Sequence, residues 1–202
     1  MQAKNTPRTN KARTDATRSA LLKAARALFA DQGYADTSTP DIVKAAGVTR
    51  GALYHHFDDK MGLFREVVKQ EYAAVAAEID RSAKRNPTSA VDALRQGSRG
   101  FLGAMQDRGR VRIMLLDGPV VLGYEQLGQI DRDTSADSLR LGLEAAMQAG
   151  EIKAIPLDAL TGQLSALFDR TALAIAAGGN RTEHLEALDA ILDGLATGQT
   201  QP

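Results

Sequence analysis

The sequence predicts an all-α protein of about nine helices. Apolar residues recur with a period of about 3.6 along most of the chain, and hardly any segment shows the alternation that a half-buried strand needs. The chain of 202 residues is 44% apolar and 25% charged, a composition typical of a globular protein that buries a core. Glycines and prolines lie between the periodic segments, where they start or end helices.

Helix-ending and helix-capping residues set the bounds of the first two predicted helices. Gly33 ends a first helix that covers about residues 14–32. Ser38 can cap the second helix, with Pro40 in the first turn, where a missing N–H costs nothing. Gly47 stops this helix after barely two turns.

The third predicted helix is short, begins after Thr49 and is followed by a long one. Asp58 or Asp59 caps the long helix, which covers about residues 60–84. The stretch Asn-Pro-Thr-Ser breaks it, so residues 85–88 form the best candidate for a hinge. Further helices are predicted near residues 89–106, 110–116, 120–129, 134–149, 157–177 and 183–197.

The chain lacks the features of secreted, membrane-spanning or thiol-dependent proteins. It contains no cysteine, which excludes disulfides, zinc–thiolate sites and thiol nucleophiles. No apolar run approaches the roughly 18 residues that a membrane span needs. Residues 1–18 contain no apolar core of a secretory signal. We therefore expect a soluble, cytoplasmic protein.

Charge is unevenly distributed along the chain, although the net charge is zero. Residues 1–57 carry nine basic and four acidic side chains, a balance of +5, so the remainder carries −5. A basic end on an acidic body favours a polyanion as partner. For residues 1–13 alone, a solvated tail and an arm that enters the DNA minor groove are both open interpretations.

Two adjacent histidines, His55 and His56, lie in the stretch GVTRGALYHHFDDK, residues 47–60. Neighbouring helical side chains point about 100° apart, so one metal ion does not readily bind both. No serine or aspartate has the ordered base and orienting partner that mark a nucleophile, and His184 stands alone. These residues therefore indicate no metal, no cofactor and no enzymatic activity.

The same stretch suits a helix that reads DNA. Two short helices joined at Gly47 match the length and turn of a helix-turn-helix, whose second helix enters the major groove. Gly51 and Ala52 are small enough to let that helix approach base edges, and Arg50 can bind a guanine through two hydrogen bonds. Hydroxyl, imidazole and ammonium groups nearby can donate to phosphates.

Residues 21–68, LLKAARALFADQGYADTSTPDIVKAAGVTRGALYHHFDDKMGLFREVV, resemble the DNA-binding domain of the tetracycline-repressor (TetR) family. The elements ALFAxxGY, DIVKAAGV and GALYHHFxxKxxLF occur in the family's order and spacing. The resemblance implies that Arg50, Gly51 and Ala52 face base edges, and that Leu53 and Phe57 are core residues. It also implies a set of residues that mainly contact phosphates: Thr39, Thr49, Tyr54, His55, His56 and Lys60. For Tyr54 or His55, a contact to a base is an open alternative.

Two positions depart from the family's pattern. Position 52 is often threonine, and Ala52 lacks that hydroxyl although it can pack on a thymine methyl. Position 40 can carry a base-reading side chain in the family, which Pro40 cannot replace. We therefore expect Arg50 to carry most of the base reading. For His55, a solvated surface role and a DNA contact are equal alternatives.

The region after the helix-turn-helix is long enough for dimerisation, ligand sensing or both. The helix predicted over 157–177 is apolar on more than one side, so it needs a neighbour besides its own core. The resemblance implies that the last two helices form a four-helix bundle with a twofold mate, which presents two recognition helices to an inverted-repeat operator. The predicted interface residues are Leu164, Leu167, Ile175, Leu188, Ile191 and Leu195.

Large, adaptable and aromatic residues on the middle helices predict a ligand pocket. For any single one of these residues, ordinary core packing is a sufficient explanation. For the whole set, the family resemblance favours a pocket for a small, largely apolar effector. Gly97, Gly100 and Gly103 lie in a helical pattern, which predicts close helix packing and not a dinucleotide loop. The predicted pocket residues are Phe101, Met105, Met114, Leu115, Tyr124, Leu127, Met147 and Phe168.

These observations predict three regions. Residues 1–13 form a basic flexible arm, residues 14–60 the DNA-binding domain with its helix-turn-helix at about 38–57, and residues 61–202 an effector-binding and dimerisation domain. The expected function is a homodimeric, sequence-specific repressor that a small molecule releases from double-stranded DNA. An activator or a ligand-independent repressor is the nearest alternative. A small enzyme fused to a DNA-binding head and a nonspecific architectural DNA binder are more distant ones.

Overall fold

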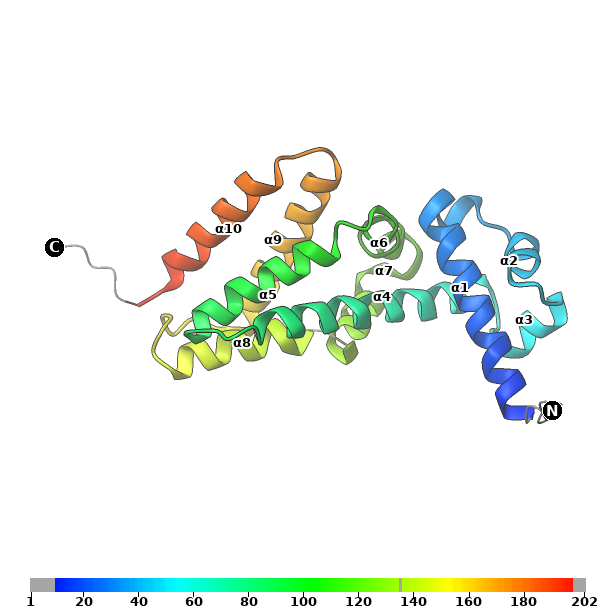
Figure 1. Cartoon of the computed structure of the whole chain (residues 1–202), viewed down its shortest axis with the longest axis horizontal. Coiled ribbons are helices and arrows are strands. Elements are labelled where there is room, and N and C mark those ends of the chain that lie inside the picture. The colour runs from blue at the N-terminus through cyan, green and yellow to red at the C-terminus, as the bar shows by residue number, and fades with distance from the viewer. Residues whose placement is uncertain (1–9, 135, 198–202) are drawn as a thin grey trace, which may run out of the picture. The chain divides into compact units, whose positions relative to one another are not determined.

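The protein is all-α in the computed structural model, which describes residues 10–134 and 136–197 (Figure 1). The described part contains no strand, only an isolated antiparallel bridge between Ile152 and Ala196. None of its helices is long and apolar enough to cross a membrane. The elements are α1 (Asn10–Asp36), α2 (Thr39–Ala46), α3 (Arg50–His56), α4 (Lys60–Ala83), α5 (Ala90–Ala104), α6 (Arg108–Val111), the π-helix η1 (Arg112–Asp117), α7 (Gly118–Thr134), α8 (Ala136–Gln148), α9 (Leu157–Ala176) and α10 (Arg181–Leu195).

The predicted helix count is confirmed once uninterrupted helices are joined. Because α6, η1 and α7 follow one another without a gap, the described residues form nine separate helical segments. The predicted long helix from residue 60 and the break after it are also confirmed, since α4 ends at Ala83 and α5 begins at Ala90. Asp59 supplies the cap at the start of α4, where its carboxylate accepts a hydrogen bond of 2.6 Å from the Gly62 N–H.

The chain divides into two compact units, one up to Val68 and one from Lys69 onward. The N-terminal unit extends past the predicted boundary at residue 60 because Phe64 of α4 belongs to its core. The Phe64 ring lies edge-on to Phe29 of α1, with centroids 5.1 Å apart, and contacts Tyr34 at 5.0 Å. Leu21, Ile42 and Leu53 complete this interior, and none of them is exposed to solvent.

The first helix begins earlier than predicted. Asn10 is already helical, and the Thr14 hydroxyl donates a 3.0 Å hydrogen bond to the Asn10 carbonyl one turn before it. Residues 10–13, predicted as part of a flexible arm, therefore form the first turn of α1, which suits their alanine and long basic side chains. Residues 1–9 of the predicted arm lie outside the described residues. Gly33 breaks the helix as predicted, with a φ of 87°.

The C-terminal unit is organised around α5, which contacts α8, α9 and α10 (Figure 1). The close helix packing predicted from its glycines is found at Gly100. A Cβ built there would lie 2.7 Å from the Ser82 side chain and 2.9 Å from the Glu78 carbonyl of α4, so only glycine fits. At Gly103 the same construction meets nothing within 4 Å, so close packing does not explain that glycine.

A distant carboxylate caps the start of α5. Glu151, in the turn between α8 and α9, accepts hydrogen bonds from the Ala90 and Val91 N–H groups at 3.1 and 2.9 Å. These two backbone hydrogen bonds hold the pKa of the Glu151 carboxyl below its usual value. The contact fixes the beginning of α5 against the far end of α8.

Candidate functional site

The turn between α2 and α3 has the geometry that its sequence predicts. The Ser38 hydroxyl caps α2 by accepting a hydrogen bond of 3.2 Å from the Asp41 N–H. Gly47 ends the helix in the left-handed region, with a φ of 65°, and its N–H donates to the Lys44 carbonyl at 3.2 Å. A residue with a side chain would be strained there, so Gly47 lets α3 leave α2 at a sharp angle.

The third helix presents one polar face and buries the other. Thr49 caps it by accepting a hydrogen bond of 3.2 Å from the Ala52 N–H. Leu53 and Phe57 lie in the core, as predicted. The opposite face exposes Arg50 and Tyr54, and the Arg50 guanidinium carbon lies 5.5 Å from the centroid of the Tyr54 ring. The ring therefore supports the arginine side chain that is predicted to read a base.

The remaining predicted DNA contacts lie on or beside this face. Gly51 and His55 are exposed, whereas Ala52 and Thr39 are half-buried. The His55 and His56 rings are 5.3 Å apart at an angle of 71°. Partial burial of His56, followed by the charges of His55 and Arg18, lowers the pKa of His56, and Asp15 opposes this shift. A neutral His56 attracts phosphate less than an imidazolium does.

Lys60 makes contacts within the N-terminal unit that the sequence did not predict. Its ammonium group donates 2.9 Å hydrogen bonds to the carbonyls of Tyr34 and Thr37, and lies 4.1 Å from the centroid of the Tyr34 ring. These contacts join the start of α4 to the connection between α1 and α2. The sequence could not indicate this role, because the two carbonyls belong to a backbone turn more than twenty residues away. Lys60 therefore stabilises the N-terminal unit, and its predicted phosphate contact stays a prediction.

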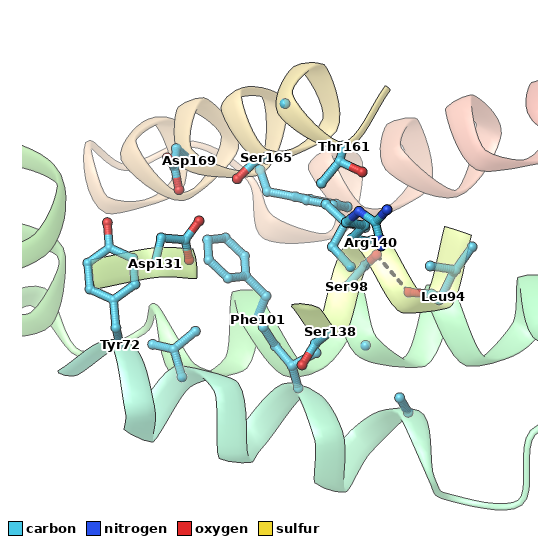
Figure 2. A pocket seen from close by; sticks show the side chains of 18 of the residues that line it. Tyr72, Leu94, Ser98, Phe101, Asp131, Ser138, Arg140, Thr161, Ser165 and Asp169 are labelled. Atoms are coloured by element: carbon cyan, nitrogen blue, oxygen red, sulfur yellow. Dashed lines mark hydrogen bonds between the residues drawn. The ribbon is translucent and has the colours of Figure 1, made fainter. Parts of the chain in front are cut away.

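The C-terminal unit encloses a cavity of about 480 Å³ between α4, α5, η1, α7, α8 and α9 (Figure 2). Three of the predicted pocket residues line it, namely Phe101, Met114 and Phe168. The rings of Phe101 and Phe168 pack against each other with centroids 5.9 Å apart. Their size and position give the cavity an aromatic wall.

The other five predicted pocket residues do not line the cavity. Met105 and Leu127 are buried in the core, and Leu115 and Met147 pack partly buried against it. Tyr124 is 83% exposed. For Leu115, Tyr124 and Leu127, the prediction counted 3.6 residues per turn through a region that contains a π-helix and a second break, at Gly123, where φ is 75°. Both features change which side chains face inward.

The two ends of the cavity differ in charge. At one end lie Tyr72 of α4, Asp131 of α7 and Asp169 of α9 (Figure 2). Burial, followed by the charge of Asp131, raises the pKa of Asp169 to about 7, and burial also raises the pKa of Tyr72. At the other end, the Arg140 guanidinium pairs with Asp158 at 3.2 Å and with Glu144 at 3.5 Å.

The sequence analysis missed most of the polar lining. Tyr72 could have been found, because Tyr72, Val75 and Ile79 follow a helical spacing on one face of α4. Asp131 gives no such signal, since it lies in a polar stretch at the end of α7. The described residues contain no group of three histidine, aspartate or glutamate side chains arranged to hold a metal ion.

The predicted dimer residues divide into two groups. Leu164 and Leu188 are only 5% and 3% exposed and belong to the core of a single chain, which leaves little of either side chain for a mate. They are buried because α9 and α10 pack on α5 with the same apolar stripes that suggested an interface. Ile191 is 43% exposed. The other three predicted interface residues, Leu167, Ile175 and Leu195, are partly buried.

This arrangement defines a class of protein. A capped helix, a left-handed glycine and a second short helix with an exposed arginine at its start form a helix-turn-helix, the fold element of DNA-binding regulators. Residues 21–67 match the bacterial regulatory proteins of the tetR family, and residues 91–199 match the tetracyclin repressor-like C-terminal domain. The chain belongs to the TetR family and is a DNA-binding transcriptional regulator.

Similarity to individual relatives extends over both units. The chain is 28% identical to the transposon Tn10 TetC protein of Escherichia coli over 153 residues, which cover 76% of this chain and 77% of that protein. It is 50% identical to the transcriptional regulator AcrR of Shigella flexneri over 60 residues, but these cover only 30% of this chain and 28% of AcrR. A crystal structure of a TetR-family transcriptional regulator from Pectobacterium atrosepticum has a TM-score of 0.75 and 30% identity, covering 95% of this chain and 99% of that one.

Proposed function

We propose that this regulator is a cytoplasmic repressor that binds an inverted-repeat operator as a homodimer and leaves it when a small molecule fills the cavity. The observation that carries the proposal is the pairing of two features in one chain. One is the exposed Arg50 at the start of a short helix with small neighbours, and the other is the cavity of about 480 Å³.

The contacts proposed for α3 follow from its exposed face. Arg50 reads a base edge, with Gly51 and Ala52 allowing close approach. Tyr54 holds the guanidinium in place and donates its hydroxyl to a phosphate or a base. Thr39, Thr49, His55 and His56 contact phosphates and fix the register of the helix on DNA.

Helix α4 supports a coupling between ligand and DNA, because it belongs to both units. Tyr72 on α4 lines the cavity, and the neighbouring Glu71 accepts a 2.7 Å hydrogen bond from Arg110 of α6. At the other end of the same helix, Lys60 is bound to two carbonyls of the N-terminal unit. A ligand that displaces Tyr72 therefore acts on a helix that is attached at its start to the DNA-binding unit.

Dimerisation is proposed through the outward faces of α9 and α10. Ile191 is an exposed apolar residue, and Ala187, Ala190 and Gly194 lie exposed on the same side of α10, where small side chains permit close approach of a second helix. Ile191→Glu is expected to convert a dimer to a monomer in sedimentation equilibrium. Leu141→Glu, at an exposed apolar position of α8, is the matched control and should leave the dimer intact.

Nuclease footprinting on DNA beside the protein's own gene tests the proposal directly. We expect a protected inverted repeat, and reduced transcription from the promoter that contains it. Diffuse protection would instead indicate a nonspecific DNA binder, and increased transcription an activator. A footprint that no cellular extract or compound library weakens would indicate a ligand-independent repressor.

A further inference from the structure

Two hydroxyl groups of the cavity lining already donate their protons within the protein. Ser98 donates to the Leu94 carbonyl at 2.8 Å, and Thr161 donates to the Leu157 carbonyl at 2.8 Å. A hydroxyl has one proton and two lone pairs, so these two oxygens can only accept a hydrogen bond from a ligand. Figure 2 shows both residues at the end of the cavity where Arg140 lies. This end therefore offers hydrogen-bond acceptors.

The opposite end of the cavity offers acceptors as well. Asp169 of α9 lies there, half-buried, near the Tyr72 hydroxyl, and in Figure 2 the Phe101 ring lies between the two ends. An ionised carboxylate only accepts hydrogen bonds, and among the described residues none donates one to Asp169. The oxygen of the Tyr72 hydroxyl can accept too. A ligand that donates a hydrogen bond at each end is therefore the best match for these groups.

The charges of the lining nearly balance, which favours a neutral ligand. The described lining contains two basic and three acidic residues, namely Arg132, Arg140, Asp131, Asp158 and Asp169. Asp158 and Glu144 already pair with Arg140 at 3.2 and 3.5 Å, so an anionic ligand would compete with both. Burial, followed by the charge of Asp131, raises the pKa of Asp169 to about 7, so its charge is only partial near neutral pH. A charged ligand gains little on either account.

The apolar part of the lining selects the body of the ligand. The rings of Phe101 and Phe168 lie 5.9 Å apart at an angle of 48°, and they form an aromatic wall. Contacts between aromatic rings add to the energy of apolar burial. Val75, Ile79 and Leu94 supply further apolar surface. A flat aromatic body uses this wall, and a cavity of about 480 Å³ is large enough for a few rings.

We infer that the effector of the cavity is a neutral, flat aromatic compound with a hydroxyl group at each end. Its ring system lies against Phe101 and Phe168. One hydroxyl donates to Ser98 or Thr161, and the other donates to Asp169. The inference rests on the proposed effector role of the cavity. It replaces the broader expectation of a small, largely apolar effector with one defined chemical class.

A matched series of naphthalene compounds tests the inference. The three probes are a naphthalenediol with one hydroxyl on each ring, its dimethyl ether, and the dicarboxylate of the same substitution. At pH about 7.5 the diol is neutral and donates, the ether only accepts, and the dicarboxylate is an anion. Isothermal titration calorimetry with the full-length protein gives the three affinities.

The diol should bind at least about tenfold more tightly than its dimethyl ether, since each donated hydrogen bond contributes a factor of about two to ten. The dicarboxylate should bind most weakly, because it brings negative charge and further acceptors to a lining that already has both. A diol that binds no more tightly than the ether or the dicarboxylate overturns the inference. So does a diol that does not bind.

Variants that remove the acceptors should remove the preference for the diol over the ether. The double variant Ser98→Ala with Thr161→Val deletes two oxygens at one end, and Asp169→Leu deletes the carboxylate at the other. Each should lower the preference, and all three changes together should abolish it. Circular dichroism establishes that each variant keeps its helical content.

Matched controls make the same changes at exposed positions outside the cavity lining. They are Ser19→Ala with Thr182→Val, and Asp133→Leu, and they should leave the preference unchanged. Gly162→Phe adds bulk at a lining position where a Cβ meets nothing within 4 Å, and should weaken binding of the diol and the ether alike.

The outcomes distinguish this inference from the proposed function. A diol preference that survives removal of all three acceptors overturns the assigned contacts and leaves the cavity as an effector site. Diol binding that Gly162→Phe does not affect lies elsewhere on the protein and overturns the inference as well. Diol binding that depends on the acceptors and on the open cavity supports the inferred ligand class. If such binding leaves operator affinity unchanged, it is ligand-responsive repression that fails.

Discussion

The two units of the chain differ in how completely their interiors are filled. In the N-terminal unit, Phe29, Tyr34 and Phe64 pack ring against ring, and neither Phe29 nor Phe64 is exposed to solvent. The C-terminal unit keeps a cavity of about 480 Å³, a π-helix and a broken α7. The difference follows from what each unit must recognise. A DNA groove demands a fixed surface, whereas ligand-dependent regulation demands a region that can rearrange.

Removing one phenylalanine from each unit tests this contrast with the largest expected effect. Phe64→Ala should lower the free energy of unfolding by about 3–5 kcal/mol, because the ring is fully enclosed. Phe168→Ala should cost about 2 kcal/mol, because one side of that ring already faces a cavity. Urea denaturation of both variants gives the two values. Equal losses would show that the C-terminal unit is packed as tightly as the N-terminal one.

Lys60→Ala tests whether the start of α4 is a structural anchor. The substitution removes two hydrogen bonds from an ammonium group to carbonyls, so we expect the free energy of unfolding to fall by about 2 kcal/mol. Lys44→Ala, at an exposed position of α2, is the control and should change stability little. If Lys60→Ala leaves stability unchanged and weakens binding to every DNA sequence, Lys60 contacts a phosphate and is not a structural anchor.

Arg50→Ala probes the exposed face of α3 without touching its core. Binding to the operator should weaken by about 1–3 kcal/mol, with relaxed base preference at one position in each half-site. Competition binding against a set of single-base operator variants measures both effects. His55→Ala serves as the comparison and should weaken binding to all variants alike. If Arg50→Ala weakens binding to all operator variants equally, Arg50 does not read a base.

The pH dependence of stability reports on the acidic end of the cavity. The ordinary pKa of an aspartate carboxyl is 3.8, and burial raises the pKa of Asp169 to about 7 in the folded chain, so between these values the native state binds more protons than the unfolded state. The free energy of unfolding should therefore fall as pH rises through this window, by up to about 1.4 kcal/mol per pH unit. Below the window both states are protonated and no penalty remains. Asp169→Asn should flatten this slope in thermal denaturation, whereas Asp133→Asn should preserve it.

The helix-turn-helix could be predicted from the sequence nearly residue by residue. Its caps at Ser38 and Thr49 and its left-handed glycine at Gly47 act over three or four residues, so their spacing in the chain already specifies their geometry. Leu53 and Phe57 were predicted as core for the same reason, because a single short helix places them on one face.

The cavity was predicted less well. Phe101, Met114 and Phe168 line it, but Tyr124 is exposed because η1 and Gly123 change the register of the intervening helix. Leu164 and Leu188, predicted at a dimer interface, are buried within one chain, since an apolar stripe does not say which neighbour covers it.

The sequence by itself determined the fold class, the DNA-reading helix and the family. Those properties depend on short-range periodicity and on capping chemistry. Only the tertiary structure decided that Lys60 binds two carbonyls and that Tyr72, Asp131 and Asp169 meet at one end of a cavity. Such contacts join residues from distant helices, and their proximity depends on the packing angles and helix breaks between them.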